Sequence, residues 1–237
     1  MGIENRVAVI TGATGGLGRV VARRFAEHGA RLALFGTNAG RLAQLAGELS
    51  LPEERRLTHV VNLQEREAVQ AAAAAVLAKF GRAEILLHLV GGWIGGKPVA
   101  DVSADEVSEM LDQHLWTTFN VAQAFLPHLR ANGWGRLVAI SSPHASRPPA
   151  NAAPYAIGKA AQEALISTLA QEAQDRGVTA NLLLVRTIDV QRDRDRERTP
   201  KNASWTTPEE IAAAILYLCS DEARAVNGAR IPLYGGP

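Results

Sequence analysis

Seven short runs of β-branched and aliphatic residues alternate with longer segments of helical periodicity, and this alternation constrains the fold most. Strands are expected at residues 6–10, 32–35, 58–61, 84–90, 136–141, 178–185 and 229–233. Helices are expected at residues 16–28, 39–49, 64–80, 104–130, 154–176 and 208–219. Strands joined through helices lie parallel and are connected by right-handed crossovers. The sequence therefore predicts an α/β fold, with one doubly wound parallel sheet of seven strands covered by helices on both faces.

Size and composition favour a single globular domain over residues 1–237, because neither a linker nor an internal repeat interrupts the pattern. The chain carries 25 Lys and Arg against 24 Asp and Glu, a net charge of +1. That balance provides no basic excess for a nucleic-acid partner. No apolar run reaches the roughly 18–20 residues that span a bilayer, and the N-terminus lacks a signal-type apolar region. We therefore expect neither a nucleic-acid nor a membrane partner, and a cytoplasmic location.

The most biased segment follows the sixth expected strand, where residues 192–198 alternate Arg with Asp or Glu. A solvated loop and an active-site lid are compatible interpretations, and we assign residues 191–205 as the candidate lid. Trp205 is a candidate for closing it. The single cysteine, Cys219, lies in an apolar helical pattern and is expected to be a buried structural thiol.

A glycine-rich turn joins the first strand to the first helix, in the sequence Thr-Gly-Ala-Thr-Gly-Gly-Leu-Gly at residues 11–18. Glycines allow backbone N–H groups to approach a diphosphate, and the helix N-terminus adds partial positive charge. The alternative is a glycine-rich turn without a ligand. The strand–turn–helix context favours a dinucleotide site of the Rossmann type, whose candidate residues here are Gly12, Thr14, Gly15, Gly16, Leu17 and Gly18.

The end of the second strand indicates which dinucleotide is bound. A carboxylate at this point grips the adenosine ribose of NAD and repels a 2′-phosphate. This chain has Thr37 and Asn38 there instead, with Arg41 close behind. The sequence therefore favours NADP(H) over NAD(H) as the cofactor.

Three polar residues form a candidate acid–base group at the carboxyl edge of the sheet. Tyr155 and Lys159 are four residues apart on one helix face, and Ser142 ends the fifth strand. A Lys ammonium about 4 Å from a Tyr hydroxyl is worth roughly 1–4 kcal/mol, which would lower the Tyr pKa by about 1–3 units. Ser142 is able to hydrogen-bond a substrate oxygen.

With these motifs in order, the chain resembles the compact, single-domain short-chain dehydrogenases/reductases over essentially its whole length. The matching features are the glycine turn, Ser142, Tyr155-x-x-x-Lys159, the Thr-Pro-Glu-Glu-Ile-Ala run at 207–212, Gly228 and the Tyr-Gly-Gly ending at 234–236. The resemblance implies hydride transfer between a nicotinamide cofactor and a small carbonyl or alcohol substrate. Tyr155 would be the acid/base, Lys159 would bind the nicotinamide ribose and lower the Tyr155 pKa, and Ser142 would orient the substrate.

The resemblance also implies further site residues and an assembly. Added cofactor contacts would be Tyr155, Lys159, Asn62, Leu63, Val90, Gly91, Gly92 and Ile188. The helices at 104–130 and 154–176 form the usual contact faces of the family, and the second carries the small-residue surface Ala160, Ala161, Ala164 and Leu165. We therefore expect a homo-oligomer, either a dimer or a tetramer.

Several positions depart from the family pattern near the expected nicotinamide. His88 and His114 each replace an Asn, Arg186 replaces a Gly, and Val190 replaces a Thr. His114 stays a catalytic candidate because the family uses the main-chain carbonyl of this position. Two imidazoles without a carboxylate or thiolate partner make a poor metal site, so no metal is expected. His144 and Trp93 are candidates for the pocket wall.

These departures leave an alternative function open. The chain would then be a weakly active or inactive nucleotide-binding regulator or partner subunit, or a purely structural subunit with an empty cleft. The complete Ser142, Tyr155 and Lys159 set favours the enzyme.

Overall fold

The strands form one parallel sheet in the order β3-β2-β1-β4-β5-β6-β7, in a computed structural model that describes residues 2–234. Their bounds are β1 Val7–Thr11, β2 Arg31–Gly36, β3 Arg56–Val60, β4 Ile85–His88, β5 Gly135–Ser141, β6 Val178–Val185 and β7 Arg230–Leu233. The order reverses between β1 and β4, and in open α/β sheets ligands bind in the crevice at this point. The predicted fold class is confirmed.

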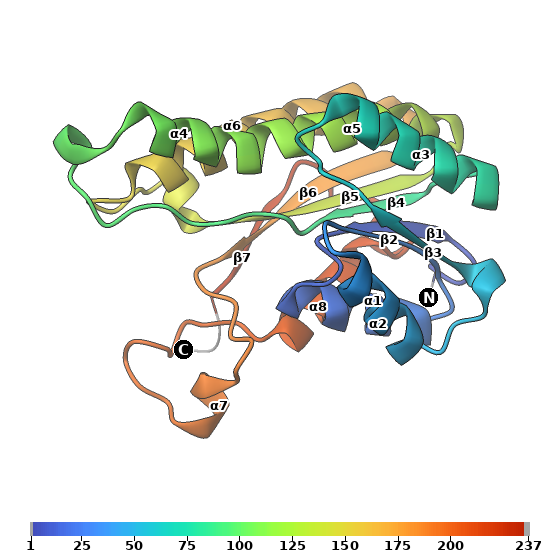
Figure 1. Cartoon of the computed structure of the whole chain (residues 1–237), viewed down its shortest axis with the longest axis horizontal. Coiled ribbons are helices and arrows are strands. Elements are labelled where there is room, and N and C mark those ends of the chain that lie inside the picture. Colours follow the sequence, from blue (N-terminus) through green and yellow to red (C-terminus); the bar gives the residue numbers. More distant parts are fainter. Residues whose placement is uncertain (1, 235–237) are drawn as a thin grey trace.

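Helices cover both faces of the sheet (Figure 1). One layer contains α1 Gly16–Glu27, α2 Ala39–Glu48 and α8 Pro208–Leu218. The other contains α3 Arg66–Phe80, α4 Ala104–Leu111, α5 Thr117–Ala131 and α6 Ala153–Glu172. A short helix, α7 Asp193–Arg196, lies outside both layers, in the segment between β6 and α8. Within residues 2–234, no helix combines the length and apolarity required to cross a bilayer.

Burial on both sides explains why the central strands β1, β4 and β6 are nearly continuous apolar runs, whereas the edge strands β3 and β7 are partly exposed. All eight residues of β6 are buried. Phe25 of α1 and Ile215 of α8 belong to the core on one side of the sheet, and Val76 of α3 and Phe125 of α5 to the core on the other. Each such side chain contributes roughly 1.5–3 kcal/mol when fully buried. The two cores hold the carboxyl ends of the central strands in fixed positions.

The long helix expected at residues 104–130 is interrupted, which corrects the sequence prediction. A π-helical segment, Asp112–Trp116, separates α4 from α5, and the Thr117 N–H donates to the Asp112 carbonyl, five residues earlier. The Thr117 hydroxyl donates to the Gln113 carbonyl at 2.7 Å, and the Thr118 hydroxyl to the His114 carbonyl at 2.5 Å. Side-chain hydroxyls thus satisfy carbonyls displaced from the regular helical pattern.

The candidate lid is attached to the rest of the domain by charged contacts. Arg192 and Arg194 pair with Glu209 and Glu210 of α8 at 2.5 and 2.7 Å. The Asp189 carboxylate accepts the N–H groups of residues 193 and 194. The segment therefore contains a helical turn where the sequence indicated only a loop. Its closing over a ligand stays a prediction.

Candidate active site

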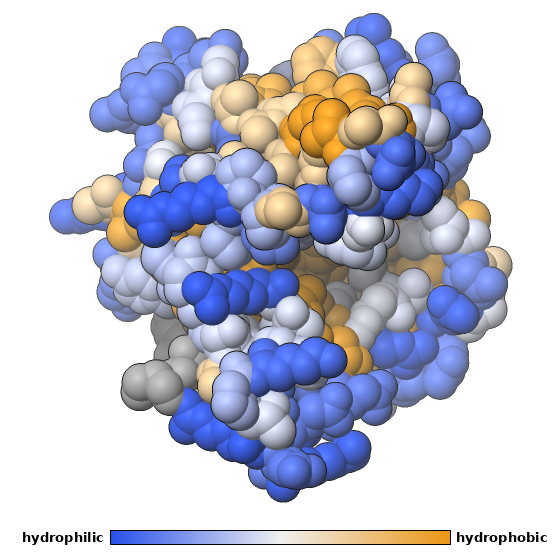
Figure 2. Space-filling model, turned by 90° about the vertical axis from the view of Figure 1, so that its left-hand side faces the viewer, coloured by the Kyte–Doolittle hydropathy of each residue, from blue (hydrophilic) through white to orange (hydrophobic). Residues whose placement is uncertain are grey.

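Two adjoining cavities follow the carboxyl edge of the sheet. One, of about 610 Å³, lies among β4, β5, β6 and α6, and the other, of about 380 Å³, lies beside the glycine turn and the ends of β2 and β3. Both are lined by Leu89, Val90 and Gly91, the residues that follow β4. Figure 2 shows that the molecule is hollowed on the side that carries α4 and α7. Each volume is in the range typical of small-molecule sites.

The glycine turn has the close backbone packing that its sequence predicts. Gly12 has φ +67°, and a Cβ there would lie 3.1 Å from the Leu89 carbonyl oxygen. A Cβ at Gly18 would overlap the Gly12 carbonyl oxygen. Gly12, Thr14 and Gly15 line the smaller cavity, whereas Gly16, Leu17 and Gly18 form the first turn of α1. That turn contains no acidic residue, so the exposed N–H groups at the start of α1 favour an anion.

The smaller cavity contains most of the residues expected on the adenosine side. Thr37, Asn62 and Leu63 line it, and none of its lining residues is Asp or Glu. Asn38 is not among them, because its side-chain oxygen caps α2 by accepting the Arg41 N–H at 2.9 Å. Its side chain therefore has a structural partner that the sequence interpretation did not anticipate.

The larger cavity contains the expected nicotinamide side. Its lining includes Val90, Gly91, Gly92, His114, Tyr155, Lys159 and Ile188, together with the pocket-wall candidates Trp93 and His144. Ser142 is buried rather than part of this lining, and the neighbouring Ser141 lines the cavity. Val190 lies elsewhere, over the start of α1, where a Cβ on Gly16 would meet its side chain.

The Tyr155 ring lies between two imidazoles. It makes edge contacts with the rings of His114 and His144, with centroids 5.4 and 5.8 Å away. Burial raises the pKa of Tyr155, and a side-chain hydrogen bond with Ser142 opposes the rise. The hydroxyl is therefore protonated at neutral pH, and Ser142 is its side-chain partner.

The expected lowering of the Tyr155 pKa by Lys159 is wrong for this structure. The Lys159 Nζ lies 6.0 Å from the Tyr155 ring centroid and donates to the Ile140 carbonyl and the Gln162 Oε1 at 2.8 and 3.0 Å. Burial lowers the pKa of Lys159 to about 7, although the negative charge of Glu163 opposes the shift. Near neutral pH only about half of the Lys159 side chains are charged. Burial is therefore the main influence on the pKa of Tyr155, and it raises that pKa.

Comparison with known proteins identifies the family. Residues 12–237 match the family model described as enoyl-(acyl carrier protein) reductase. A (2S)-[(R)-hydroxy(phenyl)methyl]succinyl-CoA dehydrogenase subunit, BbsC of Thauera aromatica, is 30% identical over 98% of this chain and 94% of its own. The chain belongs to the short-chain dehydrogenase/reductase family. It is an NAD(P)-dependent oxidoreductase.

Two further proteins of this kind are similar over nearly their whole lengths. The 1,6-dihydroxycyclohexa-2,4-diene-1-carboxylate dehydrogenase of Pseudomonas putida is 30% identical over 98% of this chain and 93% of its own. The crystal structure of levodione reductase superposes with a TM-score of 0.89 at 26% identity, covering 99% of this chain and 98% of that one.

His88, at a position where the family has Asn, forms a complete set of hydrogen bonds. The Thr117 hydroxyl donates to Gln113, so it accepts from the His88 Nε2–H at 3.3 Å. The His88 Nδ1 is then the acceptor for the Thr11 hydroxyl at 3.0 Å. Burial, with the positive charge of Lys159 adding to it, lowers the pKa of His88 to about 3. A neutral imidazole thus links β1, β4 and the start of α5.

His114 also stays neutral, which restricts what it contributes. Its Nε2 donates to the Gly92 carbonyl at 3.1 Å, and burial together with Lys159 lowers its pKa to about 3. Its Nδ1 is buried without a hydrogen-bond partner among the described residues. The ring therefore packs against Tyr155 and does not supply a proton, and the main-chain carbonyl of His114 accepts from the Thr118 hydroxyl.

The sequence analysis missed two residues: Gln162, which connects this carbonyl to Lys159 through Thr118, and Glu163, which connects β5 to β7. The Gln162 Nε2 donates to the Thr118 hydroxyl at 3.0 Å, which in turn donates to the His114 carbonyl. The Glu163 carboxylate accepts from the Ser141 hydroxyl and from Arg230, both at 2.7 Å. Gln162 and Glu163 follow Lys159 by three and four residues, and polar residues at this helical spacing were the available signal.

We predict that His88→Asn makes the free energy of unfolding less sensitive to acid. The folded pKa of His88, about 3, lies below the ordinary histidine pKa of 6.5, so the unfolded chain takes up a proton that the folded chain does not. Stability is therefore lost as the pH falls from 6.5 toward 3. Between pH 7 and pH 5 the wild type should lose about 1–2 kcal/mol more than the variant, as measured by urea denaturation.

Each protein is compared with itself at the two pH values. A hydrogen bond that Asn fails to replace lowers the free energy of unfolding of the variant equally at both pH values, so it does not affect this comparison. An equal loss in both proteins would show that His88 titrates in the folded state and is not held neutral.

Proposed function

We propose that this chain is an NADP(H)-dependent carbonyl reductase in which Tyr155 supplies the proton. The observation that carries the proposal is the convergence of Ser142, Tyr155 and Lys159 beside a cavity of about 610 Å³ that adjoins a second one at the glycine turn. Dehydrogenases and a reductase among similar proteins support the same chemistry. The substrate would be a small carbonyl compound, or the corresponding alcohol in the reverse direction.

The residues of the two cavities fit a nicotinamide dinucleotide. The glycine turn and the α1 N-terminus would hold the diphosphate, Thr37, Asn62 and Leu63 the adenosine, and Val90, Gly91, Gly92 and Ile188 the nicotinamide end. When bound, the cofactor supplies the hydride. A charged Lys159 has three N–H donors, of which two are used by Ile140 and Gln162. The third would reach the nicotinamide ribose.

The raised pKa of Tyr155 favours reduction at neutral pH. A protonated Tyr155 is ready to donate its proton to a carbonyl oxygen, and Ser142 would hydrogen-bond the same oxygen. Oxidation of an alcohol requires a deprotonated Tyr155, which then accepts the proton of the alcohol. This direction should therefore need a higher pH.

Replacing the Tyr155 hydroxyl tests the function. Tyr155→Phe should lower carbonyl-dependent NADPH oxidation by about 10²–10⁴-fold, the usual contribution of a positioned acid or base. The rate is followed spectrophotometrically with a panel of aldehydes and ketones. Tyr217→Phe is the matched control, because Tyr217 is 53% exposed on α8 and should leave the rate unchanged.

Undiminished turnover in Tyr155→Phe would remove Tyr155 from the mechanism. If the wild type binds cofactor but reduces nothing in the panel, the alternative of a nucleotide-binding regulator or partner subunit is favoured. The neutral His114 and the departures from the family pattern at Arg186 and Val190 would be consistent with that alternative.

The preference for NADP(H) is a proposal that depends on the end of β2. No carboxylate lines the smaller cavity, and Arg41 is exposed in the first turn of α2, without an ion pair among the described residues. An added phosphate would therefore meet a cation and the α2 N-terminus, and none of the described residues that line the smaller cavity is Asp or Glu.

Calorimetric titration with each cofactor measures this preference. NADPH should bind about 10–100-fold more tightly than NADH, the effect of one to two hydrogen bonds to a charged group. Arg41→Gln should reduce the ratio between the affinities for NADPH and NADH. Equal binding, or a preference for NADH, would overturn the assignment.

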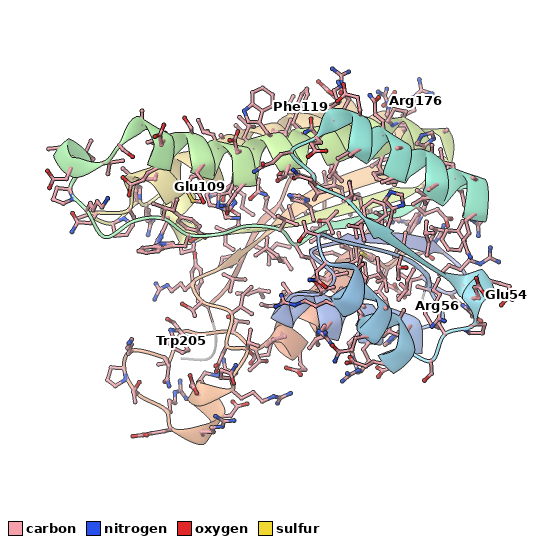
Figure 3. All side chains as sticks on the ribbon, in the orientation of Figure 1. Glu54, Arg56, Glu109, Phe119, Arg176 and Trp205 are labelled. Carbon is pink, nitrogen blue, oxygen red and sulfur yellow. The ribbon has the colours of Figure 1, made fainter. Side chains whose placement is uncertain are left out.

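We also propose a homo-oligomer, either a dimer or a tetramer, formed through α4, α5 and α6. Ala160 and Ala164 are exposed on α6, and Ala161 and Leu165 beside them are half-buried. Trp116 and Phe119 pack edge to face with ring centroids 5.9 Å apart, and Figure 3 shows Phe119 on the outer side of this layer. Light scattering at micromolar concentration should give a multiple of the 25.3 kDa chain mass, and a monomer would contradict it.

A cytoplasmic location stays a prediction.

A further inference from the structure

Arg186 places a positive charge inside the larger cavity. It directly follows β6, it is exposed, and it lines the cavity together with His144 and Tyr155. The family pattern has a glycine at this position, so the guanidinium is an addition of this chain. The proposed hydride transfer assigns it no role.

Neutral groups hold the Arg186 side chain. Its Nη1 donates to the Ser204 hydroxyl at 3.3 Å, and its guanidinium lies 4.9 Å from the centre of the Tyr234 ring. Among residues 2–234 it makes no ion pair, unlike Arg192 and Arg194 of the adjacent lid, which pair with acidic residues of α8. Within residues 2–234 the partners of the Arg186 guanidinium are therefore neutral groups.

The rest of the cavity lining leaves that charge uncompensated. Among residues 2–234, neither Asp nor Glu lines the cavity, and the only other Lys or Arg that does is Lys159. Burial lowers the pKa of His144, and the positive charge of Arg186 lowers it further. Since the His144 ring contacts the edge of Tyr155, the field of Arg186 reaches the neighbourhood of the reacting hydroxyl.

Apolar side chains complete the wall around this cation. Trp93 is 60% exposed although it lines the cavity, and Val90 and Ile188 line it as well. A ligand that fits the cavity therefore combines an apolar body with an anionic group. Such a ligand would satisfy the guanidinium and cover the exposed Trp93 ring.

We propose that Arg186 binds a carboxylate of the substrate, so that the chain reduces oxo acids and oxidises the corresponding hydroxy acids. The proposal rests on the reductase function above. A guanidinium and a carboxylate match as two parallel N–H to O hydrogen bonds. In reduction the carbonyl carbon takes up the hydride of NADPH, the carbonyl oxygen takes up the Tyr155 proton, and the bound carboxylate is unchanged.

The test compares oxo acids with neutral ketones of matched shape. The probes are 4-oxopentanoate against 2-pentanone and 5-oxohexanoate against 2-hexanone. For at least one pair, kcat/KM of the wild type should favour the acid by about 10–100-fold, the effect of hydrogen bonds to a charged group. In Arg186→Gln that ratio should fall close to one, mainly through a higher KM for the acid.

Arg23→Gln is the matched control, because it removes the same charge from an exposed position on α1 and should leave the ratio unchanged. Calorimetry with the NADPH-loaded protein measures binding of the same oxo acids without turnover. Oxo-acid binding that weakens at least tenfold in Arg186→Gln supports the carboxylate site, even if no probe is reduced. A lack of reduction would count only against the reductase function.

Three results would overturn the carboxylate site. The first is an acid-to-ketone ratio, or an oxo-acid affinity, that survives in Arg186→Gln. The second is an Arg186→Gln variant that loses NADPH affinity by the same factor, because Arg186 would then be a cofactor contact. The third concerns the wild type alone. Reduction of neutral ketones without preference for acids would leave the reductase standing and remove the proposal.

Discussion

Burial of polar side chains at the carboxyl edge of the sheet is the constraint on which the site depends. A polar group buried there needs a protein partner, since an unsatisfied one costs about 1–3 kcal/mol. His88 meets this requirement through Thr11 and Thr117, and Lys159 meets it through Ile140 and Gln162. The partners belong to different strands and helices. Satisfying the buried groups therefore also fixes the glycine turn, the π-helical segment and α6 relative to one another.

The π-helical segment illustrates this coupling. A regular helix from α4 through α5 would pair the carbonyls of Gln113 and His114 with backbone N–H groups. Here the hydroxyls of Thr117 and Thr118 donate to those carbonyls. Thr117 continues to His88, and Thr118 continues through Gln162 to Lys159. The irregular turn thus connects the departures from the family pattern at residues 88 and 114 with Lys159.

Local patterns predicted the fold and the best-defined part of the site. The strand runs, the glycine turn and the spacing of Tyr155 and Lys159 are short-range features whose physical meaning depends on a few neighbouring residues. Glu163 was missed because its partners are remote, Arg230 being 67 residues away along the chain. The Tyr155 pKa was mispredicted because a pairwise distance argument omits the desolvation that also brings Lys159 to about 7.

The support of Arg186 has a consequence for how specificity can change in this lineage. Its guanidinium rests on Ser204, in the lid, and on Tyr234, beyond β7. An acidic residue at either place would form an internal ion pair and cancel the charge presented to the cavity. If Arg186 binds the ligand as proposed, ligand preference can change through Ser204 or Tyr234 while Tyr155 and Lys159 stay as they are.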